Sequence, residues 1–265
     1  MISNSKYIYL SVVSHISRIL IIIFSSLALA DSTLTDDIRI SSKILGYDLQ
    51  YRVYLPAGYE SRKEHPVMFL TDGHNYLRRG NMDSVLDELI NTERISPVIS
   101  VFVDPRNPDN LEDNRRRRQF LCNEDYLIFF IDELIPAIEE SYPVIKNREG
   151  RTIMGLSFGG TNAACFGLMG YNIFSGIAMH SPANHPIPNL LPAYQSVPRL
   201  PLKIFLSTGT PNDNTRANRD FHEILKAKQY PMKYIEVNEG HNWDNWGQLL
   251  DDALIFYYGE TDLIN

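Results

Sequence analysis

The sequence predicts an α/β fold with a mostly parallel central sheet and helices on both faces. Short apolar segments, typical of buried strands, alternate with helical segments along most of the chain, and this alternation is typical of a parallel sheet. The helical segment 125–141 carries its apolar residues on one stripe, as a helix packed on a sheet does. The chain has 265 residues with 44% hydrophobic content, so we expect one large core and a single domain over residues 31–265.

The first half of the expected sheet begins with an antiparallel pair. Segments 38–45 and 49–55 are rich in apolar residues, and we expect them to pair with each other. The continuous apolar runs 66–70 and 98–103 predict buried strands. The helices expected in this half cover 82–91 and 125–141.

The second half repeats the alternation of strand and helix. Residues 151–154 predict a short buried strand that leads into a helix of small residues. Residues 181–201 contain six prolines, and this composition predicts a cap-like loop. The remaining elements are strands at 177–179, 202–206 and 233–237 and a helix around Phe221.

The motif Gly155-Leu156-Ser157-Phe158-Gly159 lies between the predicted strand 151–154 and the helix that follows it. We predict that Ser157 lies at a sharp turn, which is the setting of a nucleophilic serine raised above the end of a sheet. Glycine on both sides removes side chains that would collide with the neighbouring strand and helix. The N–H of Phe158 and the helix dipole would stabilise an oxyanion. An ordinary Gly/Ser turn is the alternative interpretation.

An acid and then a histidine follow Ser157 along the chain, which is the order that acyl-transfer chemistry at the end of such a sheet requires. Asp213 and His241 lie in the loops after the last two predicted strands. We predict that His241 is the general base and that Asp213 orients it. Asp220 is the alternative acid, although its helical neighbours indicate a surface salt-bridge residue.

The other histidines have different predicted roles. His180 follows the strand 177–179 near the active end of the sheet, and we predict that it lines the substrate site. His222 lies in an amphipathic helix, which indicates a surface or packing role. No further ligands at metal spacing accompany His180 and His185, so we predict neither a metal nor a cofactor.

Four segments carry a resemblance to a known family. They cover residues 46–56, 67–75, 155–159 and 240–246, within a similarity that extends over about residues 38–258. The chain resembles esterases of the esterase D and enterochelin (enterobactin) esterase type, a branch of the α/β-hydrolases. The last segment, with Gly240 and His241 followed by Trp246, looks like the family's Gly-His-x-x-x-x-Trp ending.

The resemblance implies an α/β-hydrolase fold and a serine hydrolase that acts on carboxylic esters. It implies that Ser157 is the nucleophile, that His241 acts first as base and then as acid, and that Asp213 orients the imidazole. The family's acid loop is usually a compact Gly-Thr-x-Asp, whereas this chain has one more residue between Thr210 and Asp213. The choice between Asp213 and Asp220 therefore stays open.

A second oxyanion donor is expected in the loop after strand 66–70, which faces the serine turn in this architecture. Gly73 permits a close approach of the backbone, and the N–H of His74 or Asn75 is an alternative donor. A simple strand-exit turn is the alternative interpretation, since Asp-Gly is common in turns.

Four consecutive arginines, 115 to 118, follow the strand 98–103 in a chain whose net charge is −7. We predict that Arg115 and Arg118 contact the substrate together with His180 and Trp243. Positive charge at this place suits an anionic group such as a carboxylate, phosphate or catecholate. A solvated run paired with nearby acidic residues is the alternative. No extended basic face accompanies the run, so nucleic acid is not expected as a partner.

Residues 1–30 predict a secretory signal peptide. Lys6 and Arg18 precede a short apolar segment that ends in Ala28-Leu29-Ala30, which is the pattern of a cleaved signal. The apolar run is shorter than the ~20 residues of a spanning helix, although a membrane anchor is the alternative. We expect a secreted or periplasmic protein with no stable membrane span after cleavage.

The cysteines and the class of function leave alternatives open. Cys165 lies in the helix after Ser157, where a buried free thiol is common, so a free thiol is favoured over a disulfide with Cys122. The favoured function is an exported serine esterase for a small-molecule ester, such as a siderophore lactone or an aryl or sugar ester. An acyltransferase of the same fold and a catalytically silent binding protein are the alternatives. The oligomeric state stays open.

Overall fold

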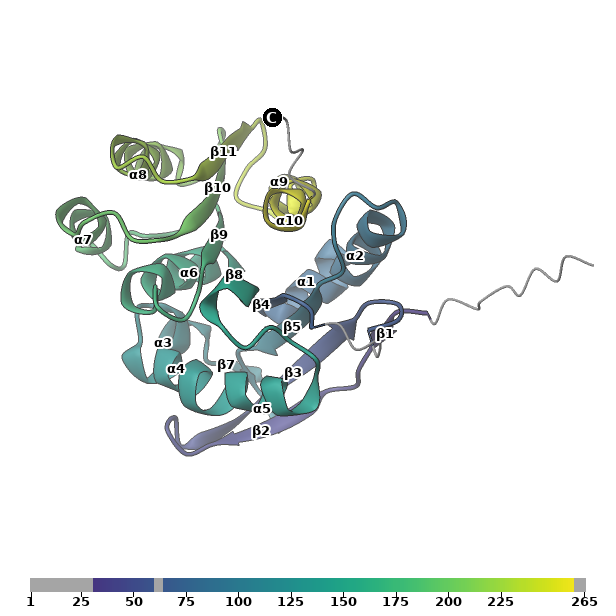
Figure 1. The fold of residues 1–265 in the computed structure, drawn as a ribbon. Helices are drawn as coiled ribbons and strands as arrows, with labels where there is room; N and C mark the ends of the chain where they lie inside the picture. The colour runs from purple at the N-terminus through teal and green to yellow at the C-terminus, as the bar shows by residue number, and fades with distance from the viewer. Residues whose placement is uncertain (1–30, 60–63, 260–265) are drawn as a thin grey trace, which may run out of the picture.

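A nine-stranded sheet forms the centre of the molecule within residues 31–59 and 64–259, the parts of the chain that the computed structural model describes (Figure 1). The strand order is β1-β3-β5-β4-β8-β9-β10-β11, and β2 pairs with β3 beside this path. The strands are β1 (Thr33–Leu34), β2 (Ile38–Ser42), β3 (Tyr47–Leu55), β4 (Val67–Thr71), β5 (Ile99–Asp104), β8 (Arg151–Leu156), β9 (Gly176–His180), β10 (Lys203–Gly209) and β11 (Met232–Val237).

The sheet is parallel over most of its width and antiparallel at one end. β4 pairs in parallel with β5 and β8, and β9, β10 and β11 continue the parallel series. β3 pairs antiparallel with β1, β2 and β5. The predicted mostly parallel sheet and its opening antiparallel pair are confirmed. The carboxyl ends of the parallel strands share one edge, where α/β sheets carry their sites.

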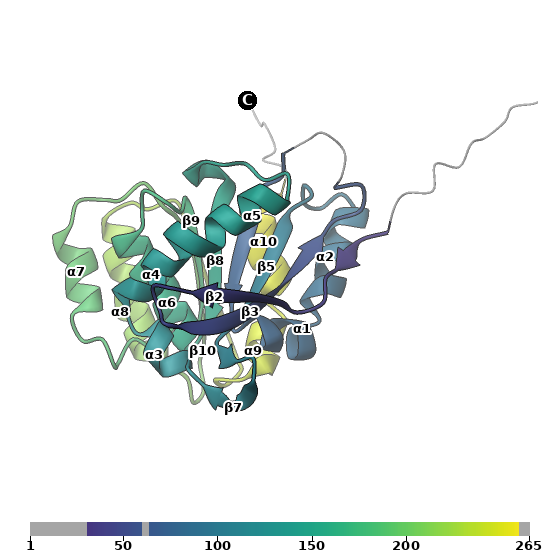
Figure 2. The same ribbon diagram turned by 90° about the horizontal axis from the view of Figure 1, so that it is seen from below.

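Helices cover both faces of the sheet, as Figures 1 and 2 show. The described residues form two apolar cores, one on each face. Residues 159–167, which follow Ser157 and the half-buried Phe158, are all buried. One face carries α3 (Arg116–Phe120), α4 (Glu124–Phe129), α5 (Ile135–Ser141), α6 (Phe158–Met169), α7 (Leu190–Ser196) and α8 (Thr215–Ala227), and the other carries α1 (Gly73–Gly80), α2 (Met82–Asn91), α9 (Trp243–Gly247) and α10 (Leu250–Tyr258).

Three small elements complete the described fold. A hairpin of β6 (Arg106–Asn107) and β7 (Asn110–Asn114) follows β5, and a short 3-10 helix at Arg148–Gly150 precedes β8. The helix predicted over 125–141 runs from α4 through a π-helical turn at Phe130–Leu134 into α5. Pro136 lies in the first turn of α5 and has no N–H to donate, which explains why the regular hydrogen-bond series is interrupted there.

The prediction of a cap-like loop over residues 181–201 is wrong for residues 190–196, which form α7. Leu190 and Tyr194 of α7 are buried in the core beside α6, and the Tyr194 hydroxyl donates to the carbonyl of Ala164 at 2.7 Å. Pro192 lies in the first turn of α7, where backbone N–H groups have no acceptor within the helix, so the missing N–H costs no hydrogen bond. Proline content alone therefore did not exclude a helix.

Cys122 and Cys165 form a disulfide, so the favoured free thiol is wrong. Cys122 follows α3 and Cys165 lies within α6, and their Cα atoms are 5.1 Å apart. Cys165 is fully buried, as the helix predicted. Sequence spacing could not reveal the pair because the two positions are 43 residues apart and meet only when α3 packs on α6.

Removal of this disulfide should lower the stability of the protein. A cross-link over 43 residues restricts the unfolded chain, and loop-closure entropy gives a loss of about 4 kcal/mol for Cys122→Ala combined with Cys165→Ala. Urea unfolding followed by circular dichroism measures this difference. Reduced wild-type protein is the control and should match the double variant; equal stability of the oxidised wild type and the double variant would contradict the prediction.

The signal peptide predicted for residues 1–30 lies outside the described residues. In the ranges 31–59 and 64–259, no helix is both long enough and apolar enough to cross a bilayer.

Candidate active site

Ser157 occupies a strained turn between β8 and α6. Its backbone angles are φ 55° and ψ −120°, which residues other than glycine rarely adopt. A Cβ atom on Gly155 would lie 2.1 Å from the carbonyl carbon of Gly159, so the two glycines allow β8 and α6 to meet at the turn. The Ser157 N–H donates to the carbonyl of His180 at 2.9 Å, which fixes the turn against β9. The predicted sharp turn is confirmed.

Ser157, His241 and Asp213 form one chain of hydrogen bonds. The His241 Nδ1 lies 2.7 Å from Asp213 Oδ1, and its Nε2 lies 2.8 Å from Ser157 Oγ. An ionised carboxylate only accepts hydrogen bonds, so Nδ1 carries the proton and Nε2 is free to accept from the serine hydroxyl. The rings of Trp246 and His241 meet edge to face at 5.0 Å between centroids, which supports the orientation of the imidazole.

The Asp213 side chain is fully buried, yet hydrogen bonds keep it ionised. Burial raises the pKa of this carboxyl, but hydrogen bonds from His241, the Ser181 hydroxyl and two backbone N–H groups outweigh it and hold the pKa well below its usual range. The Asn245 amide also donates to Oδ2 at 3.2 Å. Sequence reasoning missed Ser181 and Asn245, although Asn245 lies inside the segment that carried the family resemblance.

The longer acid loop is accommodated by one residue with a left-handed backbone. Asn212 has φ 51°, a conformation that asparagine tolerates better than most residues. Asn212 is exposed, and Asp213 still reaches His241. Asp220 lies exposed on α8 and is not part of this hydrogen-bonded chain.

The predicted oxyanion turn lies between β4 and α1. A Cβ atom on Gly73 would lie 2.3 Å from the carbonyl carbon of Phe102, so this position also requires glycine. Asn75 donates its N–H to the carbonyl of Asp72 at 2.8 Å, so this N–H is not free to bind an oxyanion. Among the described residues, no hydrogen bond is formed by the N–H of Gly73 or of His74. These two groups remain the candidate donors beside the first N–H of α6, at Phe158.

His180 does not line a substrate site, because its imidazole is fully buried at the end of β9. Its Nδ1 lies 3.1 Å from the Ser207 hydroxyl, and its ring packs against Phe205. Burial lowers the pKa of His180 to about 4. His180 supports Ser157 through its backbone carbonyl. The prediction failed because the sequence could not show that the strand turns this side chain into the core.

The buried His180 predicts a loss of stability in acid. Between pH 6.5 and about 4, the imidazole of His180 is protonated in the unfolded chain but stays neutral in the folded chain. The free energy of unfolding therefore falls as the pH falls through this window. The imidazole accounts for a loss of about 3 kcal/mol by pH 4. His180→Asn should remove this part of the pH dependence in urea unfolding measured from pH 8 to pH 4. His185→Asn, at an exposed histidine, is the control and should keep the wild-type profile; an unchanged profile in His180→Asn would contradict the prediction.

The four arginines contact two different places. Arg115 lies over the Tyr47 ring at 4.3 Å and donates to the carbonyl of Asp48, and Arg118 also lies over Tyr47. Arg116 and Arg117 lie over the ring of Phe158, next to Ser157. Arg115 and Arg118, which were predicted to bind substrate, therefore contact Tyr47. The arginines that lie beside Phe158 are Arg116 and Arg117.

Trp243 is the first residue of α9 and is half-buried. Its ring meets the rings of Tyr76 and Trp246 edge to face, each at 5.7 Å. A Cβ atom on Gly80 would lie 2.8 Å from this indole. Trp243 thus packs α9 against the helix that begins at the oxyanion turn, a contact that the sequence did not indicate.

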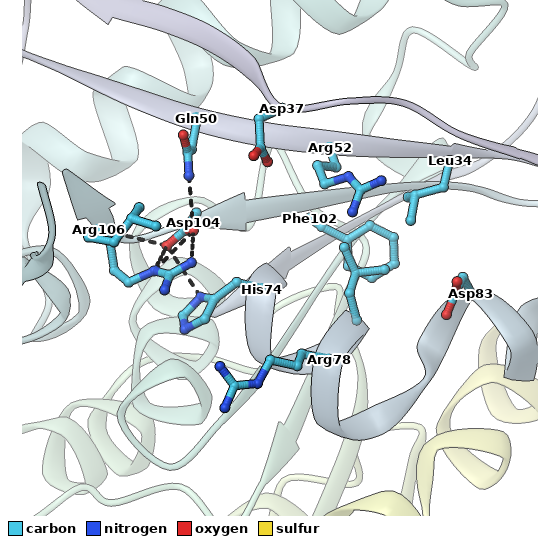
Figure 3. Close-up of a pocket in the computed structure, with 12 residues that line it drawn as sticks. Leu34, Asp37, Gln50, Arg52, His74, Arg78, Asp83, Phe102, Asp104 and Arg106 are labelled. Carbon is cyan, nitrogen blue, oxygen red and sulfur yellow. Dashed lines mark hydrogen bonds and ion pairs between the residues drawn. The ribbon is translucent and has the colours of Figure 1, made fainter. Parts of the chain in front are cut away.

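A cavity of about 340 Å³ lies beside His74, between α1 and the strands β3 and β5 (Figure 3). At one end the Asp104 carboxylate accepts from Arg106 and Gln50 and lies 3.2 Å from His74 Nδ1. Despite burial, hydrogen bonds from His74 and Arg106 hold the pKa of Asp104 well below its usual range. The lining combines both signs of charge with apolar side chains: Leu34, Asp37, Gln50, Arg52, His74, Leu77, Arg78, Asp83, Phe102, Asp104, Arg106 and Leu111.

The fold and the serine turn define an α/β-hydrolase, and solved structures similar to this chain are esterases. A ferulic acid esterase has a TM-score of 0.75 at 23% identity over 86% of this chain and 98% of that chain. The enterobactin esterase of Shigella flexneri, solved in the presence of enterobactin, has a TM-score of 0.76 at 22% identity over 84% of this chain and 58% of that chain.

The sequence comparisons assign the family. The model of the family described as "Putative esterase" matches residues 42–257, and the chain belongs to this esterase family. The uncharacterized protein YjcH of Bacillus subtilis (strain 168) is 27% identical over 228 residues, which cover 80% of this chain and 92% of that protein. The predicted family resemblance is confirmed.

Proposed function

We propose that this chain is a serine esterase that hydrolyses carboxylic esters of small molecules. His241 removes the proton from the Ser157 hydroxyl as Oγ attacks the ester carbonyl, and the protonated imidazole then donates that proton to the leaving alcohol. The N–H of Phe158, with that of Gly73 or His74, stabilises the oxyanion. Water, activated by His241, releases the acyl group and restores the serine. The continuous hydrogen bonds from Ser157 to Asp213 carry this proposal.

The substrate that we propose is an ester with an aromatic and anionic part. Phe158 offers a half-buried ring beside the nucleophile, with Arg117 over the ring at 5.6 Å and His185 at 6.0 Å between ring centroids. An aromatic group can stack on this ring while a phenolate or carboxylate meets the guanidinium. The names of the two solved esterases, for ferulic acid and enterobactin, support testing aryl and catecholate esters.

We propose that the protein acts outside the cytoplasm. The signal-like residues 1–30 support export, and the disulfide between Cys122 and Cys165 is of the kind that persists in oxidising compartments. A fusion of residues 1–30 to a reporter that is active only after export tests this part of the proposal. Export of the reporter is the expected result, and its retention in the cytoplasm would overturn it.

The experiment that tests the proposed function combines a covalent probe with a substrate panel. Residues 31–265 are incubated with a fluorophosphonate, and hydrolysis of p-nitrophenyl acetate, p-nitrophenyl butyrate, methyl ferulate and a catecholate lactone is followed. We expect labelling of wild type that His241→Ala abolishes, together with turnover of at least one aryl ester. Folded wild type that is neither labelled nor active would overturn the proposal and favour a binding protein. Acyl transfer to an added alcohol in preference to water would identify an acyltransferase.

A further inference from the structure

Arg116 connects the two turns that meet at the candidate active site. Its Nε lies 2.8 Å from each carboxylate oxygen of Asp72, and its Nη2 donates to the carbonyl of Leu156 at 2.9 Å. Asp72 immediately precedes Gly73, and Leu156 immediately precedes Ser157. One guanidinium therefore contacts both the candidate oxyanion turn and the backbone that carries the serine.

The surroundings of this contact are buried and close-packed. The Asp72 side chain is 0% exposed and that of Arg116 is 21% exposed. Asp72 has a left-handed backbone, with φ 63°, which is unfavourable for a residue other than glycine and persists only when its surroundings hold it. A Cβ atom on Gly159 would lie 3.2 Å from Asp72 Oδ2, so the carboxylate also lies against the start of α6. The guanidinium carbon is 5.4 Å from the centre of the Phe158 ring.

These contacts serve geometry more than stability. A buried ion pair gains little net stability because both groups lose their water. The flat guanidinium, however, can donate in two directions at fixed angles, which an ammonium group cannot do. An arginine at this place can therefore fix the distance between two backbone turns.

We propose that Arg116 is a positioning residue, which holds the turn at Asp72 and Gly73 in register with Ser157 and so aligns the N–H groups that bind the oxyanion. The inference rests on the proposed function. It assigns Arg116 a task different from substrate binding, because both Nε and Nη2 are already bonded to the protein. Misalignment should weaken binding of the transition state and leave binding of the substrate unchanged.

The test is the kinetic effect of Arg116→Lys, which keeps the charge next to Asp72 but cannot also reach the carbonyl of Leu156 at a fixed angle. We expect kcat for an aryl ester to fall about 100-fold with KM unchanged within about twofold. Arg148→Lys is the matched control, because the guanidinium of Arg148 also joins separate segments of the chain, through the carbonyls of Tyr171, Phe174 and Pro201, away from the triad. It should keep the wild-type kcat.

A second variant separates positioning from folding. Arg116→Met leaves the Asp72 carboxylate buried without its partner, so it should lose stability. Arg116→Met combined with Asp72→Asn removes both charges and should recover stability in urea unfolding, whereas kcat should stay low. Wild-type kcat in Arg116→Lys or in the stable double variant would overturn the inference alone. A wild type that no fluorophosphonate labels would instead overturn the proposed function, and the inference with it.

Discussion

Ser157→Ala should lower kcat/KM for ester hydrolysis by about 10⁴- to 10⁶-fold while the protein stays folded. The side chain projects from a strained turn and makes a hydrogen bond of 2.8 Å to His241, so its removal takes away the nucleophile and little packing. The residual rate would come from the oxyanion-binding N–H groups and from substrate binding. Initial rates on p-nitrophenyl butyrate, with the concentration of folded protein measured by circular dichroism, check the prediction.

The control for this substitution is Ser196→Ala. Ser196 is an exposed serine whose hydroxyl donates to the carbonyl of Ala193 within α7. It should keep wild-type activity and wild-type fluorophosphonate labelling, whereas Ser157→Ala should lose both. Hydrolysis by Ser157→Ala within tenfold of wild type would exclude the covalent mechanism.

Asp213→Asn should lower kcat by about 10⁴-fold. An asparagine fits the same space, but its amide favours the imidazole tautomer with the proton on Nε2, which cannot accept the proton of Ser157. The six donors around Asp213, His241 included, also match an ionised carboxylate better than an amide. Steady-state kinetics at pH 8 measure the loss, and KM should change little because the substrate does not touch this buried side chain.

Asp220→Asn is the matched control, since Asp220 is the other acid that the sequence offered. It lies exposed on α8 and should keep wild-type kcat. A large loss in Asp220→Asn with full activity in Asp213→Asn would reverse the assignment of the acid.

The sequence predicted those parts of the site that are encoded by short local signals. The glycines around Ser157 and at Gly73 are needed by close backbone approaches, and such positions are visible as glycine in the sequence. His241 and Asp213 follow predicted strands, so their loops had to meet at one edge of the sheet. The positions of the strands and the antiparallel start also followed from apolar patterning, whereas the order of the strands in the sheet was not predicted.

The residues that sequence reasoning missed depend on the direction of side chains in the folded chain. Arg116, in the middle of the arginine run, turns toward Asp72, whereas Arg115 turns toward Tyr47. Nothing in a run of identical residues distinguishes them. The burial of His180 was missed for a similar reason. The sequence at the end of a strand does not show on which side of the sheet the last side chain lies.

The disulfide between α3 and α6 has a practical consequence for anyone who prepares this protein. Cys122 lies at the end of the helix that carries Arg116, and Cys165 lies on the helix that begins after Ser157. Material expressed in a reducing bacterial cytoplasm would hold two thiols in place of the bond, and batches would then differ in oxidation state. A thiol titration under denaturing conditions should therefore precede every comparison of rate constants between preparations.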